Sequence, residues 1–285
     1  MAMKSSRTGI AMMGLGLLLA TAAHADPWSK TYTVNGKPSI HVNVSDGSIQ
    51  IARGGAGSVV VRVDSNHMNV STDAHISENQ SGNNIEISVR PNAMHWLHMN
   101  TNSSVTVTVT VPPEADMRME SGDGNISASQ VSGQIELNSG DGNLNLDHLG
   151  GNLRLHTGDG NISARDLDGN LDADTGDGTV TLQGRLDGIK ARSGDGDIRV
   201  EAAANSQPGS SGWELKSGDG NLSLRVPGGF RANLEAHTGD GRITVDFPVT
   251  VSGSFNEKSM SAKINGGGPT VSMTTGDGSI RIEHQ

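Results

Sequence analysis

The chain has 285 residues, 39 glycines, 2% aromatic residues, no cysteine and a formal net charge of −10 at pH 7. The acidic balance argues against nucleic acid and anionic membranes as partners. The lack of cysteine excludes disulfides and thiolate metal sites, so packing and hydrogen bonds must stabilise any folded domain.

Residues 1–25 have the features of a secretory signal peptide. Lys4 and Arg7 precede an apolar run from Ile10 to Ala20, and Ala23-His24-Ala25 forms the expected cleavage site. The apolar run is shorter than the about 20 residues that a membrane-spanning helix needs. We therefore expect an exported protein without a membrane span, periplasmic or extracellular, whose mature form begins at Asp26.

Residues 26–115 are predicted to form an irregular β region that caps a repeat domain. Alternating apolar and polar residues predict strands at Ser39 to Val44, Ser58 to Val63, Asn84 to Val89 and Val105 to Val111. A stack of β-coils needs a distinct terminal segment, because its end strands would otherwise leave their backbone groups unpaired.

Residues 116–285 contain a repeat. Gly-Asp-Gly occurs eight times, and its first five copies are spaced by 18 residues. A fixed period of this kind indicates a repeat architecture. The residue four places after the first glycine is aliphatic in every copy, which predicts one inward column: Ile126, Leu144, Ile162, Val180, Ile198, Leu222, Ile243 and Ile280.

A second strand is predicted before each Gly-Asp-Gly. Leu153 and Leu155 illustrate its two inward positions, and Asp168-Gly169 illustrates the second turn of each coil. The residue that precedes each motif carries a hydroxyl group and is expected to face inward, as in Ser139, Thr157, Thr175, Ser193, Ser217, Thr238 and Thr275. Stacking such units about 4.8 Å apart predicts an all-β, parallel β-solenoid with two-strand coils of about 18 residues.

An antiparallel meander is the competing fold, because Asp-Gly is also a hairpin signal. A meander would need a separate layer over its apolar face, and the sequence offers no helix for that purpose. Residues 203–212 and the stretch from Phe247 to Pro269 interrupt the repeat. We expect both to bulge from the coils as loops, where binding often concentrates.

Three motifs together resemble the bacterial putative-adhesin β-strand-repeat family, which is largely of unknown function. They are the [Ser/Thr]-Gly-Asp-Gly units, Val-Thr-Val-Pro-Pro-Glu-Ala at Val109 to Ala115, and Ile-Asn-Gly-Gly-Gly-Pro at Ile264 to Pro269. The resemblance covers nearly all of the chain after residue 25. It implies a β-solenoid on the outer side of a membrane and an adhesin-like role by analogy, and it brings no catalytic residues.

The aspartates of the motif are the main candidate site residues: Asp123, Asp141, Asp159, Asp177, Asp195, Asp219, Asp240 and Asp277. Stacked in register, their carboxylates would repel one another. Our interpretation is structural, with each aspartate accepting hydrogen bonds from amides of its own turn. We predict no cofactor at these residues; the alternative is a row of Ca²⁺ ions shared between coils.

Two further groups of polar residues are notable. Asn125, Asn143, Asn161 and Asn221 follow the aspartate turn, and this column suits a hydrogen-bonded ladder between coils. Residues 94–99 combine thioether and imidazole groups and are predicted to form a contact loop for a protein or glycan, with a soft metal such as copper as the alternative: Met94, His95, Trp96, His98 and Met99.

No nucleophile elbow, His-Glu-x-x-His motif or phosphate-binding loop occurs in the sequence. Polysaccharide-cleaving β-helix enzymes are the enzymatic rival, but aromatic residues of the kind that line their clefts are nearly absent. We therefore predict a non-enzymatic structural or adhesin-like interaction module whose partner is a protein or glycan of the cell envelope. The alternative function is an ion- or small-ligand-binding protein organised by the aspartates.

Overall fold

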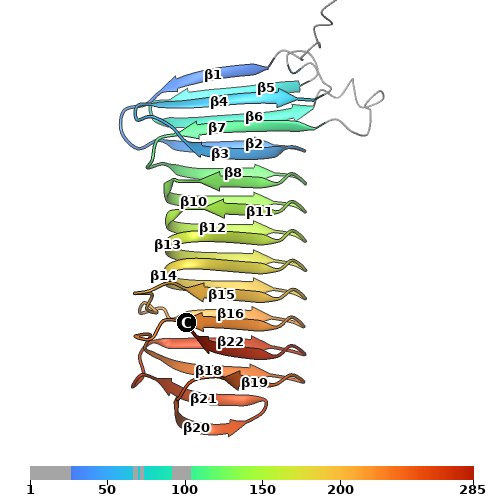
Figure 1. Cartoon of the computed structure of the whole chain (residues 1–285). Coiled ribbons are helices and arrows are strands. Elements are labelled where there is room, and N and C mark those ends of the chain that lie inside the picture. The colour runs from blue at the N-terminus through green and yellow to red at the C-terminus, as the bar shows by residue number, and fades with distance from the viewer. Residues whose placement is uncertain (1–26, 67–69, 71–73, 92–103) are drawn as a thin grey trace, which may run out of the picture.

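The computed structural model describes residues 27–66, 70, 74–91 and 104–285, which form 23 strands of one sheet (Figure 1). The predicted signal peptide and the contact loop from Met94 to Met99 lie outside the described residues. Within these ranges, no helix has the length and apolar character needed to cross a membrane. The strands are β1 (Trp28–Thr33), β2 (Ser39–Val44), β3 (Ser48–Arg53), β4 (Ser58–Ser65), β5 (Ala74–Ser81), β6 (Asn84–Pro91), β7 (Val105–Val111), β8 (Asp116–Ser121), β9 (Ile126–Ser129), β10 (Ser132–Ser139), β11 (Leu144–Asp147), β12 (Gly150–Thr157), β13 (Ile162–Thr175), β14 (Val180–Ser193), β15 (Ile198–Ala202), β16 (Trp213–Ser217), β17 (Leu222–Val226), β18 (Ala232–Thr238), β19 (Ile243–Val245), β20 (Thr250–Asn256), β21 (Ser259–Ile264), β22 (Thr270–Thr275) and β23 (Ile280–His284).

The middle of the chain is a stack of parallel coils. Strand β10 pairs in parallel with β8 and β12, and β11 pairs in parallel with β9 and β13. Ile135 lies opposite Leu153, and Leu144 lies opposite Ile162, so that equivalent positions of the repeat are neighbours. The antiparallel meander is therefore not the fold of this region, and the predicted solenoid-like, all-β architecture is confirmed.

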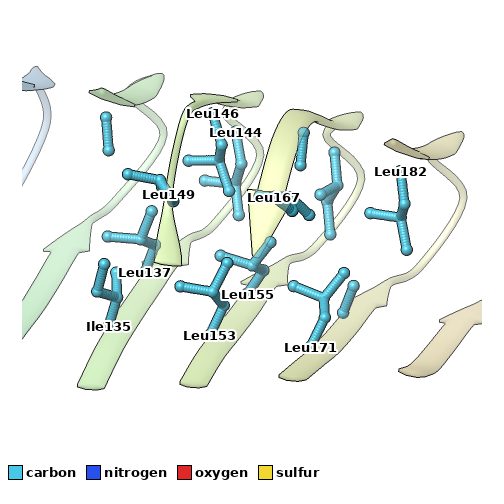
Figure 2. Close-up of a cluster of buried hydrophobic side chains, with 14 of the residues drawn as sticks. Ile135, Leu137, Leu144, Leu146, Leu149, Leu153, Leu155, Leu167, Leu171 and Leu182 are labelled. Carbon is cyan, nitrogen blue, oxygen red and sulfur yellow. The ribbon is translucent and has the colours of Figure 1, made fainter. Parts of the chain in front are cut away.

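The core is a continuous column of aliphatic side chains inside the coils. Leu144, Ile162 and Val180 are fully buried, as predicted from their place four residues after each motif. A further column was missed: Val131, Leu149, Leu167 and Leu186 are also buried. Figure 2 shows Leu149 and Leu167 directed into the same interior as Leu144 and Leu153.

A left-handed backbone residue explains most of the missed column. Gln130, His148 and Asp166 have φ angles of 59°, 53° and 51°, and each directly precedes one of the buried residues. A single residue in this conformation turns the chain sharply. The next side chain then enters the core instead of following the alternation of a straight strand.

The last coil of the sequence is not the last coil of the stack. Strands β22 and β23 lie between the coil formed by β16 and β17 and the coil formed by β18 and β19, with parallel pairing on both sides. After β17 the chain therefore leaves one coil position empty and forms the outermost coil from β18 and β19. It then returns, and β22 and β23 fill the empty position.

Residues 247–269 do not form the expected bulging loop, and that prediction was wrong. They contain β20 and β21, which form an antiparallel hairpin, and β21 pairs antiparallel with β18 at the end of the stack. The hairpin occupies the edge of β18, whose backbone groups would otherwise be unpaired. Residues 203–212 do form a loop, which is held to its coil by a hydrogen bond from the amide of Leu186 to Ser206 Oγ (3.0 Å).

The N-terminal end repeats this arrangement. Strands β2 and β3 lie between β6 and β7 on one side and β8 and β9 on the other, in parallel with both. Strands β5 and β4 pair antiparallel with β6 and β7, and β1 pairs antiparallel with β4. Residues 39–53 are thus a regular coil in register with the repeat, although they lie in the segment predicted to be irregular.

Candidate functional site: the aspartate edge

The Gly-Asp-Gly turns lie above one another and form one edge of the molecule, which we call the aspartate edge. The amide of Gly158 hydrogen-bonds the carbonyl of Gly140, and the same contact recurs from Gly176 to Gly158. All eight predicted aspartates are exposed along this edge. A ninth, Asp46, belongs to the coil of β2 and β3, where Val44 lies opposite Ser121 and Ile49 lies opposite Ile126.

Asp46 was missed because Ser45 replaces the first glycine of the motif. The remaining signal, Asp46-Gly47 followed by Ile49, matches the Asp-Gly-x-Ile part of several repeats. A search for Asp-Gly-x-aliphatic before an alternating strand would have found it.

Glycine is required in these turns because neighbouring backbones touch. A Cβ atom added to Gly160 would lie 2.1 Å from the carbonyl oxygen of Gly142, and one added to Gly142 would lie 2.2 Å from that of Gly124. No side chain fits at such a distance. The repeated glycines therefore mark close stacking of coils at the aspartate edge.

The buried hydroxyl groups hold these turns together. Thr157 Oγ1 donates to the carbonyl oxygen of Gly142 in the preceding coil (2.7 Å). Ser139 Oγ donates to the Gly124 carbonyl (2.8 Å) and accepts from the Gly142 amide of its own turn (3.1 Å). The inward position predicted for the hydroxyl column is confirmed, and each hydroxyl joins two coils.

The aspartate carboxylates do not take the hydrogen bonds that we expected from their own turns. Where the amide of the second glycine has a side-chain partner, that partner is the buried hydroxyl group. Among the described residues, the one aspartate of the edge with a side-chain partner is Asp240, which contacts Lys258 Nζ at 3.0 Å. The structure thus leaves a row of exposed carboxylates directed at solvent, and their role stays a prediction.

The asparagine column forms the predicted ladder. Asn125 Oδ1 accepts from the amide of Asn143 (2.7 Å), and Asn143 Oδ1 accepts from the amide of Asn161 (2.9 Å). Asp197 serves the same purpose for the amide of Asn221 (2.8 Å). These bonds link successive coils beside the aspartate edge, so this column is structural.

A second polar cluster lies away from the aspartate edge. Asp147, His148 and Asp166 are exposed, and their oxygen and nitrogen atoms lie close enough together to hold a metal ion. His148 Nδ1 is 2.9 Å from Asp147, and Nε2 is 3.5 Å from Asp166. The hydrogen bond to Asp147 raises the pKa of His148. Both ring nitrogens are thereby engaged with carboxylates, which favours an ion-paired imidazolium over a metal ligand.

An open groove of about 1060 Å³ crosses the strands on one face of the stack. Its lining extends from Ser39 to Thr274 and includes Glu136, Arg154 and Lys190. The groove is long and open rather than an enclosed pocket, and both polar and apolar residues line it.

The family model described as Toastrack DUF4097 matches residues 38–283. No match was found among curated proteins. Similar solved structures include a putative lipid binding protein from Parabacteroides distasonis (16% identity, 90% of this chain and 96% of that chain, TM-score 0.45) and a putative adhesin from Bacteroides fragilis (11%, 91% and 97%, 0.40). A putative cell adhesion protein from Clostridium sporogenes follows (13%, 91% and 100%, 0.29).

Proposed function

The chain belongs to the Toastrack DUF4097 family, and from this starting point we propose that it is an exported, non-catalytic, adhesin-like interaction module of the cell envelope. The observation that carries the proposal is a surface on which the same polar groups recur coil after coil. A rigid array of this kind suits a partner that is itself extended or repetitive, such as a glycan strand or an elongated protein.

The face formed by β9, β11 and their neighbours offers the contact surface. Ser127, Asn145, Ser163 and Thr181 lie opposite one another on successive parallel strands and point outward. Their short side chains leave the face flat and rich in hydrogen-bonding groups. We call these four residues, three with hydroxyl groups and Asn145 with an amide, the hydroxyl row. It is distinct from the buried hydroxyl column and runs beside the aspartate edge.

Binding to isolated cell envelopes tests this proposal. Protein recovered from periplasm or medium, with the expected N-terminus at Asp26, should co-sediment with envelope fragments. Ser163→Arg should weaken this binding at least tenfold, because it places a long charged side chain in the middle of the hydroxyl row. Ser210→Arg, in the exposed loop of residues 203–212, is the matched control and should bind like wild type.

Treating the envelopes beforehand identifies the partner class. Binding lost after protease treatment points to a protein, and binding lost after periodate oxidation points to a glycan. Equal binding by both variants, or no binding by the wild type, would contradict the proposal.

The row of exposed carboxylates favours one second candidate, a Ca²⁺-binding edge. If the aspartates hold no ion, Asp159→Asn should leave the melting temperature level or slightly higher, because it removes one charge between Asp141 and Asp177. Millimolar Ca²⁺ should then have little effect on either protein. This is the result we expect, measured by thermal unfolding with and without chelator.

A Ca²⁺-binding edge would behave differently. Wild-type protein would gain many degrees with Ca²⁺, since a ligand that binds only the folded state stabilises it, and Asp159→Asn would lose that gain. Glu235→Gln, an exposed change away from the aspartate edge, is the control and should respond to Ca²⁺ as wild type does.

A further inference from the structure

Six charged residues form a row across the face opposite the hydroxyl row, and their signs alternate. They occupy equivalent outward positions on β8, β10, β12, β13, β14 and β16, each opposite the next in the strand register. We call them the charged row: Arg118, Glu136, Arg154, Asp172, Lys190 and Glu214.

The centre of this row is not neutralised within the chain. Arg154, Asp172 and Lys190 form no ion pair within 4.0 Å in the part of the chain that the structure describes. Within the row, only Arg118 and Glu136 approach each other, at 3.8 Å. The two ends of the row are paired outside it, Arg118 with Glu120 at 2.6 Å and Glu214 with Arg192 at 2.9 Å. The three central charges, Arg154, Asp172 and Lys190, therefore remain available to a partner.

An alternating row of six charges is complementary to the same row read in the opposite direction. If a second copy faces this surface with its stack running in the opposite direction, Arg154 meets Asp172 of the other copy. Glu136 then meets Lys190, and Arg118 meets Glu214. A copy running in the same direction would instead place like charges opposite each other.

We propose that this face is an isologous homodimer interface between two antiparallel copies, with the two-fold axis parallel to the strands and between β12 and β13. An isologous contact requires a surface that complements itself under a two-fold rotation, and the charged row meets this requirement. This self-association is separate from the proposed partner binding, which uses the opposite face.

Part of the neighbouring outward column is also complementary to its own reverse. On the same six strands it reads Glu120, Asn138, His156, Asp174, Arg192 and Lys216. Reversal places Glu120 opposite Lys216, His156 opposite Asp174 and Asn138 opposite Arg192. Within each chain, His156 Nδ1 already lies 3.3 Å from Asp174. On the other side of the charged row, Gly188 lacks a side chain within the groove and would face Gln134 of the second copy.

The size of the surface predicts a modest affinity. The six strands and one neighbour at each side span about 34 Å along the stack, and a five-residue strand is about 17 Å long. The contact would bury roughly 600 Å² per copy, somewhat below the about 800 Å² per partner of a standard specific interface. Because exposed charges dominate it, dimerisation should weaken as salt is added.

Sedimentation velocity and native mass spectrometry test the interface. Wild-type protein should dimerise at tens of micromolar in low salt, and 0.5 M NaCl should shift it toward monomer. Arg154→Glu and Asp172→Arg should each raise the dimer dissociation constant at least tenfold, because each change creates two like-charged contacts across the interface. Arg165→Glu, an exposed arginine on the opposite face, is the matched control and should dimerise like wild type.

Mixing the two variants gives the most specific result. The first carries two negative charges at the centre of its row and the second carries two positive charges, so an equimolar mixture should form heterodimers although each variant alone is monomeric. The double variant Arg154→Glu/Asp172→Arg should also dimerise, since opposite charges again face each other across the interface.

The double variant separates dimerisation from a purely internal role. It leaves like charges adjacent within each chain, with position 154 beside Glu136 and position 172 beside Lys190. If the charged row served only to set the strand register within one chain, the double variant would therefore not restore wild-type behaviour. A wild type that stays monomeric at several hundred micromolar in low salt, or a mixture of variants without heterodimer, would overturn the proposal.

Discussion

Leu144→Asp is expected to cost more than about 4 kcal/mol of unfolding free energy, enough to unfold much of the stack. Leu144 is 0% exposed and lies between Ile126 and Ile162 in the register of β9, β11 and β13. Burying a carboxylate without a partner ranks among the most destabilising substitutions. A typical domain has only about 5–15 kcal/mol in total.

Urea unfolding followed by circular dichroism measures this loss. Asn145→Asp is the matched control, because it introduces the same side chain at the next residue of β11, which is exposed. Its effect should stay within about 0.5 kcal/mol. If Leu144→Asp unfolded at the same urea concentration as this control, the shared core would not be what holds the coils together.

The repeat made the core predictable from the sequence, because every coil supplies the same apolar positions at the same distance from its Gly-Asp-Gly turn. The 18-residue spacing assigns Leu144 and Ile162 to one column, and it does the same for the hydroxyl groups of Ser139 and Thr157. Stacking requires equivalent positions to meet, so the period alone determines these neighbours.

The missed core column has the same 18-residue spacing, at Val131, Leu149 and Leu167, but the left-handed residue that directs each of these side chains inward carries no glycine to mark the turn. Gln130, His148 and Asp166 adopt a left-handed backbone conformation. A glycine at these positions would have indicated this conformation, whereas three unrelated residue types do not. The acceptor of the turn amide was also missed, although the hydroxyl column was predicted to face inward, because the sequence does not show which of two nearby side-chain oxygens the amide reaches. The register places Ser139 and Thr157 inward and the aspartates outward.

The order of the end coils was not predictable for a different reason. The spacing of 37 residues before the last motif indicated an insertion, but every coil presents the same columns to both neighbours. Pattern alone therefore cannot say which coil lies beside which. The hairpin of β20 and β21 supplies the physical cause, because once it pairs with β18 that end of the stack is closed to a further coil.

This order of coils predicts that removing the last 16 residues, from Thr270 onward, lowers the unfolding free energy more than removing a longer segment before them. Strand β22 pairs with both β16 and β18, and β23 pairs with both β17 and β19. Val271, Met273, Ile280 and Ile282 are all 0% exposed. At about 1.5–3 kcal/mol for each buried side chain, their loss costs about 6–12 kcal/mol, comparable to the stability of a whole domain.

The matched comparison is a chain that lacks residues 227–267 and keeps Gly268-Pro269 as the link from β17 to β22. Two residues also link β9 to β10 and β11 to β12, so this connection can close the coil. The longer deletion removes only the outermost coil and its hairpin and leaves β22 and β23 paired with β16 and β17. Urea unfolding should therefore remain cooperative, with a midpoint closer to that of the full chain.

Hydrogen exchange locates the effect of the shorter truncation. Without β22 and β23, strands β18 to β21 have no neighbour in the stack, and Trp213, Leu215, Leu222 and Leu224 lose the coil that covers them. The amides of β16 and β17 should then exchange far faster than in the longer deletion. Equal protection of β16 and β17 in the two proteins would mean that the returning coil is not needed to join the end of the stack to its body.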